Sequence, residues 1–343
     1  MAVLDRHQNS HKLVCTNFYG QYIGFSGGGG SAQLAGWYGT IGITGMAGYY
    51  PNRNEIDYIT IASAANAQDF GDCITAVRGA DTMGNGIGGR GICVGGSTDS
   101  GQGNGGALSS PGLQYVTFTS TGNAIFFGNL LVGAYNPSPG GNDGIRGMKY
   151  GGEGGSPYYN PSIDYVTVAT TMDALDFGDM FGGGASGGSS VNDGTTSLTC
   201  GYYRAAPATH QAEIQVVTTQ TTGNATDWGP VFPVAWSGGC GSSSDSGRGV
   251  LHISDTTPPP GYNNTMEYLT IQTAADALDF GDITGGGYWS TIGKISNGVR
   301  GCVAGGYPSA NIIDHYVYAS LGNSADFGNL TVGRSMCDGI SGS

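Results

Sequence analysis

An acidic residue recurs just ahead of an aromatic–glycine pair along this chain, at Asp69, Asp176, Asp227, Asp279 and Asp326. Asp-Phe-Gly binds magnesium in protein kinases, but several copies without a glycine-rich nucleotide loop argue against that chemistry. Carboxylates that return once per repeat can instead bind calcium, or cap a turn by accepting backbone N–H groups. The pattern favours turn capping.

No other residue pattern indicates catalysis. His7 and His11 have a four-residue spacing, but they lie in a polar segment without periodicity. No Gly-x-Ser-x-Gly lies between a strand and a helix, as a hydrolase would need, and no helix is long enough for a zinc-binding histidine pair. We therefore predict a non-enzymatic protein with no catalytic, cofactor-binding or metal-binding residues.

A second series of polar residues recurs along the chain, each member a short distance ahead of an aromatic–glycine pair. One acid or amide recurs in a strand-like stretch of each copy, and we expect these side chains to be solvated or paired with the repeated arginines. The series is Asp57, Gln114, Asp164, Gln215 and Glu267, and the arginines are Arg90, Arg146, Arg248 and Arg300.

Both series belong to an internal repeat. Each copy runs from a stretch such as Ile56–Ser63 to an aromatic–glycine marker, and the marker glycines are 57, 50, 51, 52 and 47 residues apart. A period near 50 indicates a repeat architecture. The markers are Phe70-Gly71, Phe127-Gly128, Phe177-Gly178, Trp228-Gly229, Phe280-Gly281 and Phe327-Gly328.

The bulk composition narrows the possible partners. Only 11% of the 343 residues are charged, and the net charge is −13, which argues against nucleic acid or an anionic membrane surface as a partner. The 66 glycines indicate many tight turns. No stretch is apolar enough to cross a bilayer, and the N-terminus lacks the apolar run of a signal peptide. We expect synthesis in a cytoplasm without export by that route.

Each repeat reads as four strands. The first should follow the marker directly, as in residues 73–77 and 330–334, and the second often begins with Arg-Gly. The third is the Ile-Asp-Tyr stretch, and the fourth carries the marker. Gly-Asn pairs such as Gly122-Asn123 and Gly322-Asn323 should supply the positive φ angles of the hairpin between strands three and four.

Six such units predict an all-β fold, a β-propeller of six four-stranded blades. Seven blades, or an open β-solenoid, are the alternatives. We expect an N-terminal arm at 1–13 and one propeller domain at 14–343, with a degenerate marker at Phe18-Tyr19-Gly20. Six units should close without the extra terminal strands. One overhang would then latch the ring, and the other would join a neighbouring subunit by strand addition.

Cysteine and histidine add little chemistry. The seven cysteines form no CxxC pair, which gives little support for zinc or redox motifs. Cys93, Cys200 and Cys302 follow the preceding marker glycine by 22, 22 and 21 residues, so we expect buried thiols at equivalent strand positions. His315 replaces the tyrosine of the repeat and should be a packed ring.

The repeat as a whole resembles the kelch-like repeats of virion proteins from tailed phages of marine cyanobacteria. The stretch Gly322–Thr331 and Val299-Arg300-Gly301 carry the match, which covers about residues 14–338. The fourth unit, with Val216 and Trp228, and the first unit, with Thr40-Ile41-Gly42, depart from the pattern. The resemblance implies a structural or tail-associated virion protein.

Our leading interpretation is a virion protein that assembles with other virion proteins, forms a homo-oligomer and contacts the host surface. The alternative is a propeller that binds or hydrolyses carbohydrate, with host-surface glycan as its ligand. Hydrolysis would need two carboxylates in one cleft, and a propeller axis can gather one acid from each blade. Aromatics that break the repeat are candidates for a binding surface, or they fill the joints between blades: Trp37, Tyr38, Trp236, Tyr288 and Trp289.

Overall fold

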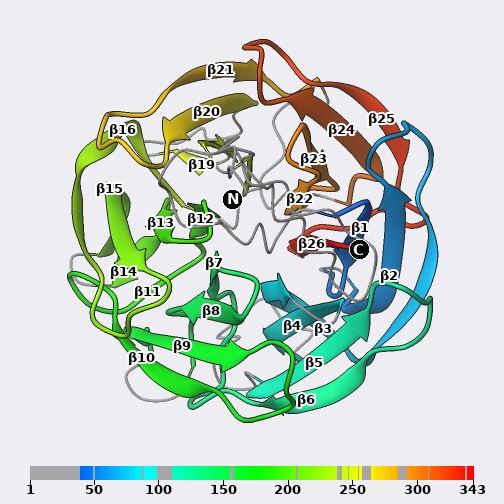
Figure 1. The fold of residues 1–343 in the computed structure, drawn as a ribbon, viewed down its shortest axis with the longest axis horizontal. Coiled ribbons are helices and arrows are strands. Elements are labelled where there is room, and N and C mark those ends of the chain that lie inside the picture. The colour runs from blue at the N-terminus through cyan, green and yellow to red at the C-terminus, as the bar shows by residue number, and fades with distance from the viewer. Residues whose placement is uncertain are drawn as a thin grey trace, which may run out of the picture. The chain divides into compact units, whose positions relative to one another are not determined.

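The computed structural model describes residues 39–48, 51–86, 89–98, 110–154, 158–205, 208–237, 242–245, 247–253, 255–256, 264–284, 292–307, 309–336 and 338–343. Within these ranges the secondary structure is strand and turn, with no helix. The strands form five antiparallel sheets around one axis (Figure 1), and the first of these sheets spans two blades, so that we number blade 1 to blade 6. The predicted β-propeller is confirmed.

Blades 1 and 2 share one long strand. From the axis outwards, blade 1 consists of β26 (Asp338–Gly342), β1 (Ile41–Gly45), β2 (Arg53–Thr60) and the start of β3 (Gln68–Gly86). Blade 2 consists of the end of β3, β4 (Arg90–Ser97), β5 (Gly112–Thr117) and β6 (Ile125–Asn129). Blade 3 consists of β7 (Ser138–Asn142), β8 (Arg146–Tyr150), β9 (Ser162–Thr167) and β10 (Leu175–Asp179).

Blade 4 carries additional strands. Its main strands are β12 (Ser189–Asn192), β13 (Thr196–Cys200), β15 (Ala208–Thr218) and β16 (Thr226–Ser237), to which β11 (Ala185–Ser186), β14 (Tyr203–Ala205) and β19 (Asp255–Thr256) are joined. Blade 5 consists of β17 (Ser242–Ser244), β18 (Arg248–His252), β20 (Thr265–Thr270) and β21 (Leu278–Asp282). Blade 6 consists of β22 (Ile292–Ser296), β23 (Arg300–Ala304), β24 (Ile312–Val317) and β25 (Ala325–Asn329).

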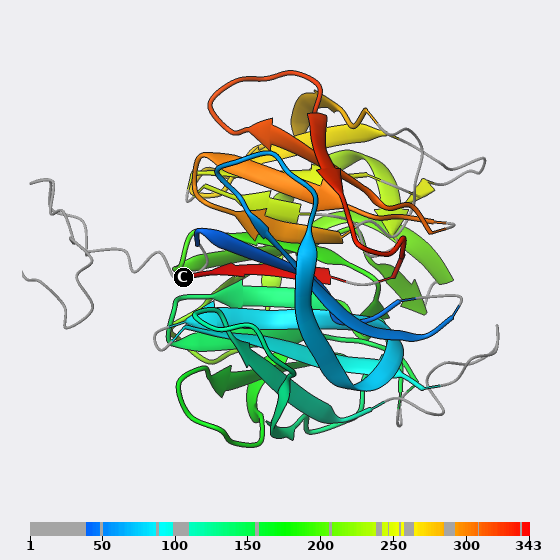
Figure 2. The same cartoon turned by 90° about the vertical axis from the view of Figure 1, so that its right-hand side faces the viewer.

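The chain closes its own ring. The last strand, β26, pairs with β1 from Ile41↔Gly342 to Gly45↔Asp338, and Figure 2 shows the red strand beside the blue one. Each inner strand contacts the inner strands of the two neighbouring blades, all the way around the axis. A closed ring of six blades rules out the seven-bladed and open-solenoid alternatives.

The expectation for the chain ends was partly wrong. The C-terminal overhang does latch the ring, but the strand is Asp338–Gly342, whereas residues 331–334 form bends and irregular backbone. Six units do not close without it, because β26 is the inner strand of blade 1. The predicted arm at 1–13 and the marker copy at Phe18 lie outside the described residues.

The inner strands begin later than predicted. In β3, Val77 still pairs with Arg53 of blade 1, and pairing with blade 2 begins at Arg78. The segment after each marker therefore crosses from the rim to the axis. The sequences of inner strands such as β7, Ser-Pro-Gly-Gly-Asn, lack the β-branched and aromatic residues typical of strands. Crowding at the axis favours small residues there instead. A Cβ on Gly140 would lie 1.9 Å from the carbonyl oxygen of Met148.

The marker aromatics pack inside the blades. Phe70, Phe127, Phe177, Phe280 and Phe327 are buried. Each meets the ring at the repeat tyrosine position edge to face, with centroids 5.7 to 6.2 Å apart, in the pairs Tyr58–Phe70, Tyr115–Phe127, Tyr165–Phe177, Tyr268–Phe280 and His315–Phe327. His315 is therefore a packed ring, as predicted.

All the marker glycines except Gly229 lie close against the backbone of the next blade. Gly281 has a φ of +139°, and a Cβ there would lie 2.4 Å from the carbonyl oxygen of Gly322. In the turn between the third and fourth strands, the two residues of a Gly-Asn pair have different roles, whereas we predicted a positive φ for both. Gly322 takes a positive φ, but Asn323 does not. The Asn323 side chain instead accepts the N–H of Asp282, at 3.1 Å, across the seam between blades.

We expect Gly281→Ala to lower the free energy of unfolding by about 3 kcal/mol, since a positive φ costs an L-residue about 1–2 kcal/mol and the overlap adds to it. Gly229→Ala is the matched control, because Gly229 also has a positive φ (+95°) but its Cβ would meet nothing within 4 Å. It should cost only the backbone strain, about 1–2 kcal/mol. Denaturant unfolding measures both, and equal losses would contradict the packing described.

The buried cysteines are free thiols, as expected, but they are not at equivalent positions. Cys93, Cys200 and Cys302 are buried in the second strands of blades 2, 4 and 6. Their cross-strand partners are Gln114, Ile214 and His315, which are three successive registers of the repeat. Counting residues from the marker was misleading because the linkers differ in length.

Candidate functional site

The inner strands of all six blades surround an axial cavity. It encloses about 420 Å³ of space, part of it open to solvent, and nine of its twelve lining residues are Ser, Thr or Asn. The lining residues are Thr82, Gly84, Asn85, Gly140, Asn142, Ser190, Asn192, Ser243, Ser244, Ser296, Ile340 and Ser341. The predicted alternative, in which repeated acids meet at the axis, does not describe this lining.

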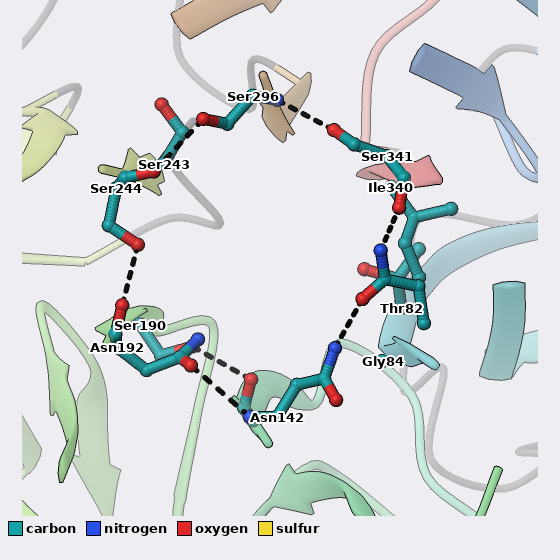
Figure 3. Close-up of a pocket in the computed structure, with 12 residues that line it drawn as sticks. Thr82, Gly84, Asn142, Ser190, Asn192, Ser243, Ser244, Ser296, Ile340 and Ser341 are labelled. Carbon is teal, nitrogen blue, oxygen red and sulfur yellow. Dashed lines mark hydrogen bonds between the residues drawn. The ribbon is translucent and has the colours of Figure 1, made fainter. Parts of the chain in front are cut away.

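One lining residue from each blade takes part in a circular hydrogen-bond network, which we call the axial belt: Asn85, Asn142, Asn192, Ser244, Ser296 and Ser341. Figure 3 labels all of these residues except Asn85. Asn85 Nδ2 donates to the Ser341 carbonyl and Asn142 Nδ2 to Asn85 Oδ1. Ser244 Oγ donates to the Asn192 carbonyl at 2.8 Å, and Ser296 Oγ to the Ser244 carbonyl at 2.9 Å. The backbone N–H groups of Asn142 and Ser296 complete the circle by donating to Asn192 Oδ1 and Ser341 Oγ.

The belt uses most of its polar groups within the protein. Its members are amides and hydroxyls, which do not titrate near neutral pH. It therefore joins the blades at the axis and offers a ligand few free donors.

The belt residues begin a capped turn that the sequence analysis missed. In blade 5, Asp245 Oδ1 accepts the N–H groups of Gly247 at 3.0 Å and Arg248 at 2.6 Å. Asp143, Asp193 and Asn297 accept equivalent bonds in blades 3, 4 and 6. The signal was present in the sequence as Asn or Ser, then Asp or Asn, shortly before the Arg-Gly position.

The acid and amide series of the third strands lies at the seams between blades. Asp57 and Asp164 are fully buried. Asp57 Oδ2 accepts the N–H of Thr331 at 2.9 Å, and Asp164 Oδ2 accepts that of Leu131 at 3.3 Å. Gln114, Gln215 and Asp314 accept the N–H groups of Ile74, Phe181 and Thr284 in the same way. The prediction of solvated side chains was wrong, because each of these five side chains holds the linker of the preceding blade.

The repeated arginines have a different role from the one predicted. Arg90 lies over the ring of Tyr115, 4.4 Å from its centroid, and donates to the carbonyl of Ala169 in the next blade at 2.9 Å. Arg146, Arg248 and Arg300 also stack on a ring of their own blade and donate to Thr219, Tyr318 and Ile61 of the next. A cation over an aromatic face and a charged donor to a carbonyl both stabilise the seam.

At the seam between blades 4 and 5, a proline occupies the linker position whose N–H group binds an Asp or Gln side chain at the other five seams. An extra residue at Pro230 shifts the linker, so that Phe232 fills the buried position and Pro233 falls where the donor N–H should be. Proline has no N–H to donate. Glu267 lies opposite Asp279 in the pairing of β20 and β21, and burial, together with that carboxylate, raises the pKa of Glu267 to about 7.

This raised pKa predicts a pH-dependent seam. The pKa in the folded state, about 7, lies above the ordinary glutamate pKa of 4.5, so the favourable contribution is complete below pH 4.5 and is lost as the pH rises through 7. We expect Glu267→Gln to melt at a higher temperature than the parent protein at pH 8 and at nearly the same temperature at pH 4. Thermal unfolding at several pH values measures this.

Glu55→Gln serves as the control for that comparison. Partial burial raises the pKa of Glu55, but hydrogen bonds from its backbone and Arg53 outweigh that and leave the pKa lowered. Glu55→Gln should therefore not stabilise the protein at pH 8. A Glu267→Gln profile parallel to that of the parent protein would refute the assignment.

Two members of the first acidic series, Asp227 and Asp279, cap turns by accepting a backbone N–H group. Asp227 Oδ1 accepts the N–H of Gly229 at 3.0 Å, and Asp279 Oδ1 accepts that of Gly281 at 3.1 Å. Both lie on fourth strands, at the start of β16 and β21. In the described part of the chain, no three His, Cys, Asp or Glu side chains form a group that could hold a metal ion.

Most of the aromatics predicted as a binding surface lie outside the described residues: Trp37, Tyr38, Tyr288 and Trp289. Trp236 is a backbone pairing partner of Gln211 and Thr256 on β16. The structure instead brings together Tyr158, Tyr159, Tyr203 and His210 on blades 3 and 4, a set that we call the aromatic ledge. The signal missed in the sequence was two tyrosine doublets, 158–159 and 202–203, in the loops of successive repeats.

No described segment is a helix with the length and apolar character needed to span a membrane. Comparison of the sequence with protein-family models and with curated proteins finds no match.

Proposed function

We propose that this chain is a non-enzymatic structural protein of a phage particle, in a tail, fibre or decoration position. The observation that carries the proposal is the axial cavity, whose lining residues are uncharged. Their polar groups are bonded from blade to blade, so the position where many propellers gather ligand groups is used here for closure. The resemblance to kelch-like virion repeats supplies the biological setting.

The construction of the ring supports a load-resisting role. The belt ties every blade to its neighbours, five of the six seams add an acid or amide that accepts a linker N–H group, and four add a stacked arginine. The segment ahead of β1 carries the marker copy Phe18-Tyr19-Gly20. We propose that it adds as a strand to a neighbouring subunit and gives a homo-oligomer in contact with other virion proteins.

Electron microscopy of intact particles with antibody against this chain tests the location. Labelling at the tail, fibres or capsid surface is expected, and unlabelled particles would contradict the proposal. Light scattering of the purified chain tests the assembly. An oligomer that becomes a monomer when residues 1–34 are removed is expected, whereas a monomeric full-length chain would exclude the strand-addition role.

Carbohydrate binding is a second candidate, favoured by the aromatic ledge. A glycan array combined with a reducing-sugar assay separates the possibilities. Binding without turnover indicates an attachment protein, turnover indicates a hydrolase, and neither result leaves the structural role alone.

A further inference from the structure

We propose that the aromatic ledge on blades 3 and 4 binds a pyranose ring of a glycan. This inference deepens the attachment part of the proposed function, because it names the site and the ligand class. The ledge joins the loop between β8 and β9 to the hairpin of β14 and β15.

The rings form a continuous row. Tyr158 and Tyr159 meet edge to face with centroids 5.0 Å apart, Tyr159 and Tyr203 are 5.8 Å apart, and Tyr203 and His210 are 5.8 Å apart. Tyr158 is 38% exposed, and the other three rings are partly exposed. This contrasts with the marker phenylalanines, which are buried. Partly exposed rings can stack on the C–H face of a sugar.

A fixed carboxylate lies beside the row. Glu153 Oε2 accepts the hydroxyl of Tyr158 at 2.7 Å, and Oε1 accepts that of Ser186 at 3.0 Å. Backbone bridges hold Glu153 between Tyr135 and Tyr159. Glu153 therefore helps to fix Tyr158 and Tyr159 in the row, and it places a carboxylate beside the exposed Tyr158 ring.

The hydrogen-bonding groups also suit a neutral polar ligand. The Tyr159 phenol is a protonated donor at neutral pH, as an ordinary tyrosine is, and burial, followed by the nearby Glu153 and Tyr203, raises its pKa further. On the same hairpin, Arg204 is paired with Glu213 and bonded to the Phe181 carbonyl. The positive charge is thus engaged while acids remain close, an arrangement that disfavours anionic ligands.

A quaternary ammonium ion is the main competing ligand, since aromatic rings and carboxylates also bind cations. Such sites surround the cation with several ring faces. Here consecutive rings contact one another at interplanar angles of 80°, 45° and 74°, and form a row. The row favours a flat, extended sugar.

Saturation-transfer NMR with the methyl pyranosides of glucose, galactose, mannose, rhamnose and N-acetylglucosamine, and with choline, tests the proposal on the full-length chain. We expect at least one pyranoside to bind, with saturation strongest on the protons of one ring face. Tyr203→Ala should weaken its affinity at least about tenfold, as loss of a stacking anchor does. Tyr203→Phe should retain most of the affinity.

Two further variants keep the test decisive. If Tyr203→Ala does not fold, the more exposed Tyr158→Ala takes its place with the same expected direction. Phe126→Ala is the matched control, because Phe126 is an aromatic residue 55% exposed on β6 of blade 2, and its removal should leave binding unchanged.

Binding of none of the pyranosides, binding of choline alone, or equal losses in Phe126→Ala and Tyr203→Ala would overturn the proposal. Particle labelling by antibody is independent of these outcomes. A labelled particle without pyranoside binding would refute this site and leave the structural role in place.

Discussion

A chain truncated after Met336 is expected to lose its cooperative thermal transition and to elute as an expanded or aggregated species. The missing strand, β26, is the five-residue inner strand of blade 1. Its Ile340 is buried in a core cluster that includes Ile43 and Ile295, and the removal of such a side chain alone costs about 2–5 kcal/mol. Circular dichroism melting and size-exclusion chromatography measure the outcome.

Side-chain bonds at the same seam add to this loss. Thr82 Oγ1, on the inner strand of blade 2, donates to Asp338 Oδ2 at 2.7 Å. Together these losses approach the whole net stability of a typical domain, about 5–15 kcal/mol. Deletion of Ser343 alone is the control, because it removes one exposed bond, from the Thr40 N–H at 3.2 Å. A truncated chain that melts like the parent would show that β26 does not close the ring.

The second large effect is expected at the buried ion pair between blades 6 and 1. Arg334 Nη2 lies 2.7 Å from Asp57 Oδ2, and both side chains are at most 1% exposed. Arg334 also donates to the carbonyls of Glu55 and Val332. Replacement of Arg334 by Met should lower the free energy of unfolding by about 3–5 kcal/mol, because it leaves an uncompensated buried carboxylate.

The double variant Asp57→Asn/Arg334→Met isolates the interaction. It should recover part of the loss, because no unpaired charge remains. The pair Arg53–Glu55 is the surface control, at 3.0 Å with side chains 26% and 35% exposed, and Arg53→Ala should cost no more than about 1 kcal/mol. Equal losses in Arg334→Met and Arg53→Ala, measured by denaturant unfolding, would contradict the burial described.

The repeat marker made the architecture predictable from sequence. The aromatic before the glycine packs on the repeat tyrosine position, and even the exception, His315, takes the same edge-to-face contact with Phe327 at 5.7 Å. The spacing of markers follows directly from one blade per repeat. Third and fourth strands were therefore placed correctly, because their residues are apolar, β-branched or aromatic, as strand propensities require.

The inner strands could not be predicted in the same way. A stretch such as Ser242–Ser244 has neither alternation nor β-branched residues, because its composition reflects crowding around the axis. Ring closure by residues 338–342 was likewise hidden, since Asp-Gly-Ile-Ser-Gly has the composition of a loop. Long-range pairing of β26 with β1 is a tertiary property that local preference does not encode.

The polar positions were found, but their partners were not. Gln114 and Asp164 recur at a visible spacing, yet the groups they bind are backbone N–H groups of the preceding linker, which the sequence does not mark. Glu267 differs from the other members of the series because Pro233 has no N–H group at the linker position that they bind. This becomes apparent only once the one-residue shift at Pro230 is known. The aromatic ledge depends on two loops that meet only in the fold.

Closure of the ring within one chain is tested most directly by a disulfide between β1 and β26. Ile43 and Ile340 are direct cross-strand partners, so Ile43→Cys/Ile340→Cys places two thiols at a separation that suits a disulfide. Peptide mass spectrometry after mild oxidation should find residues 43 and 340 linked within one chain, in protein that still runs as a monomer on denaturing gels. A link found only between two chains, or no link under conditions that oxidise exposed thiols, would contradict the closed six-bladed ring.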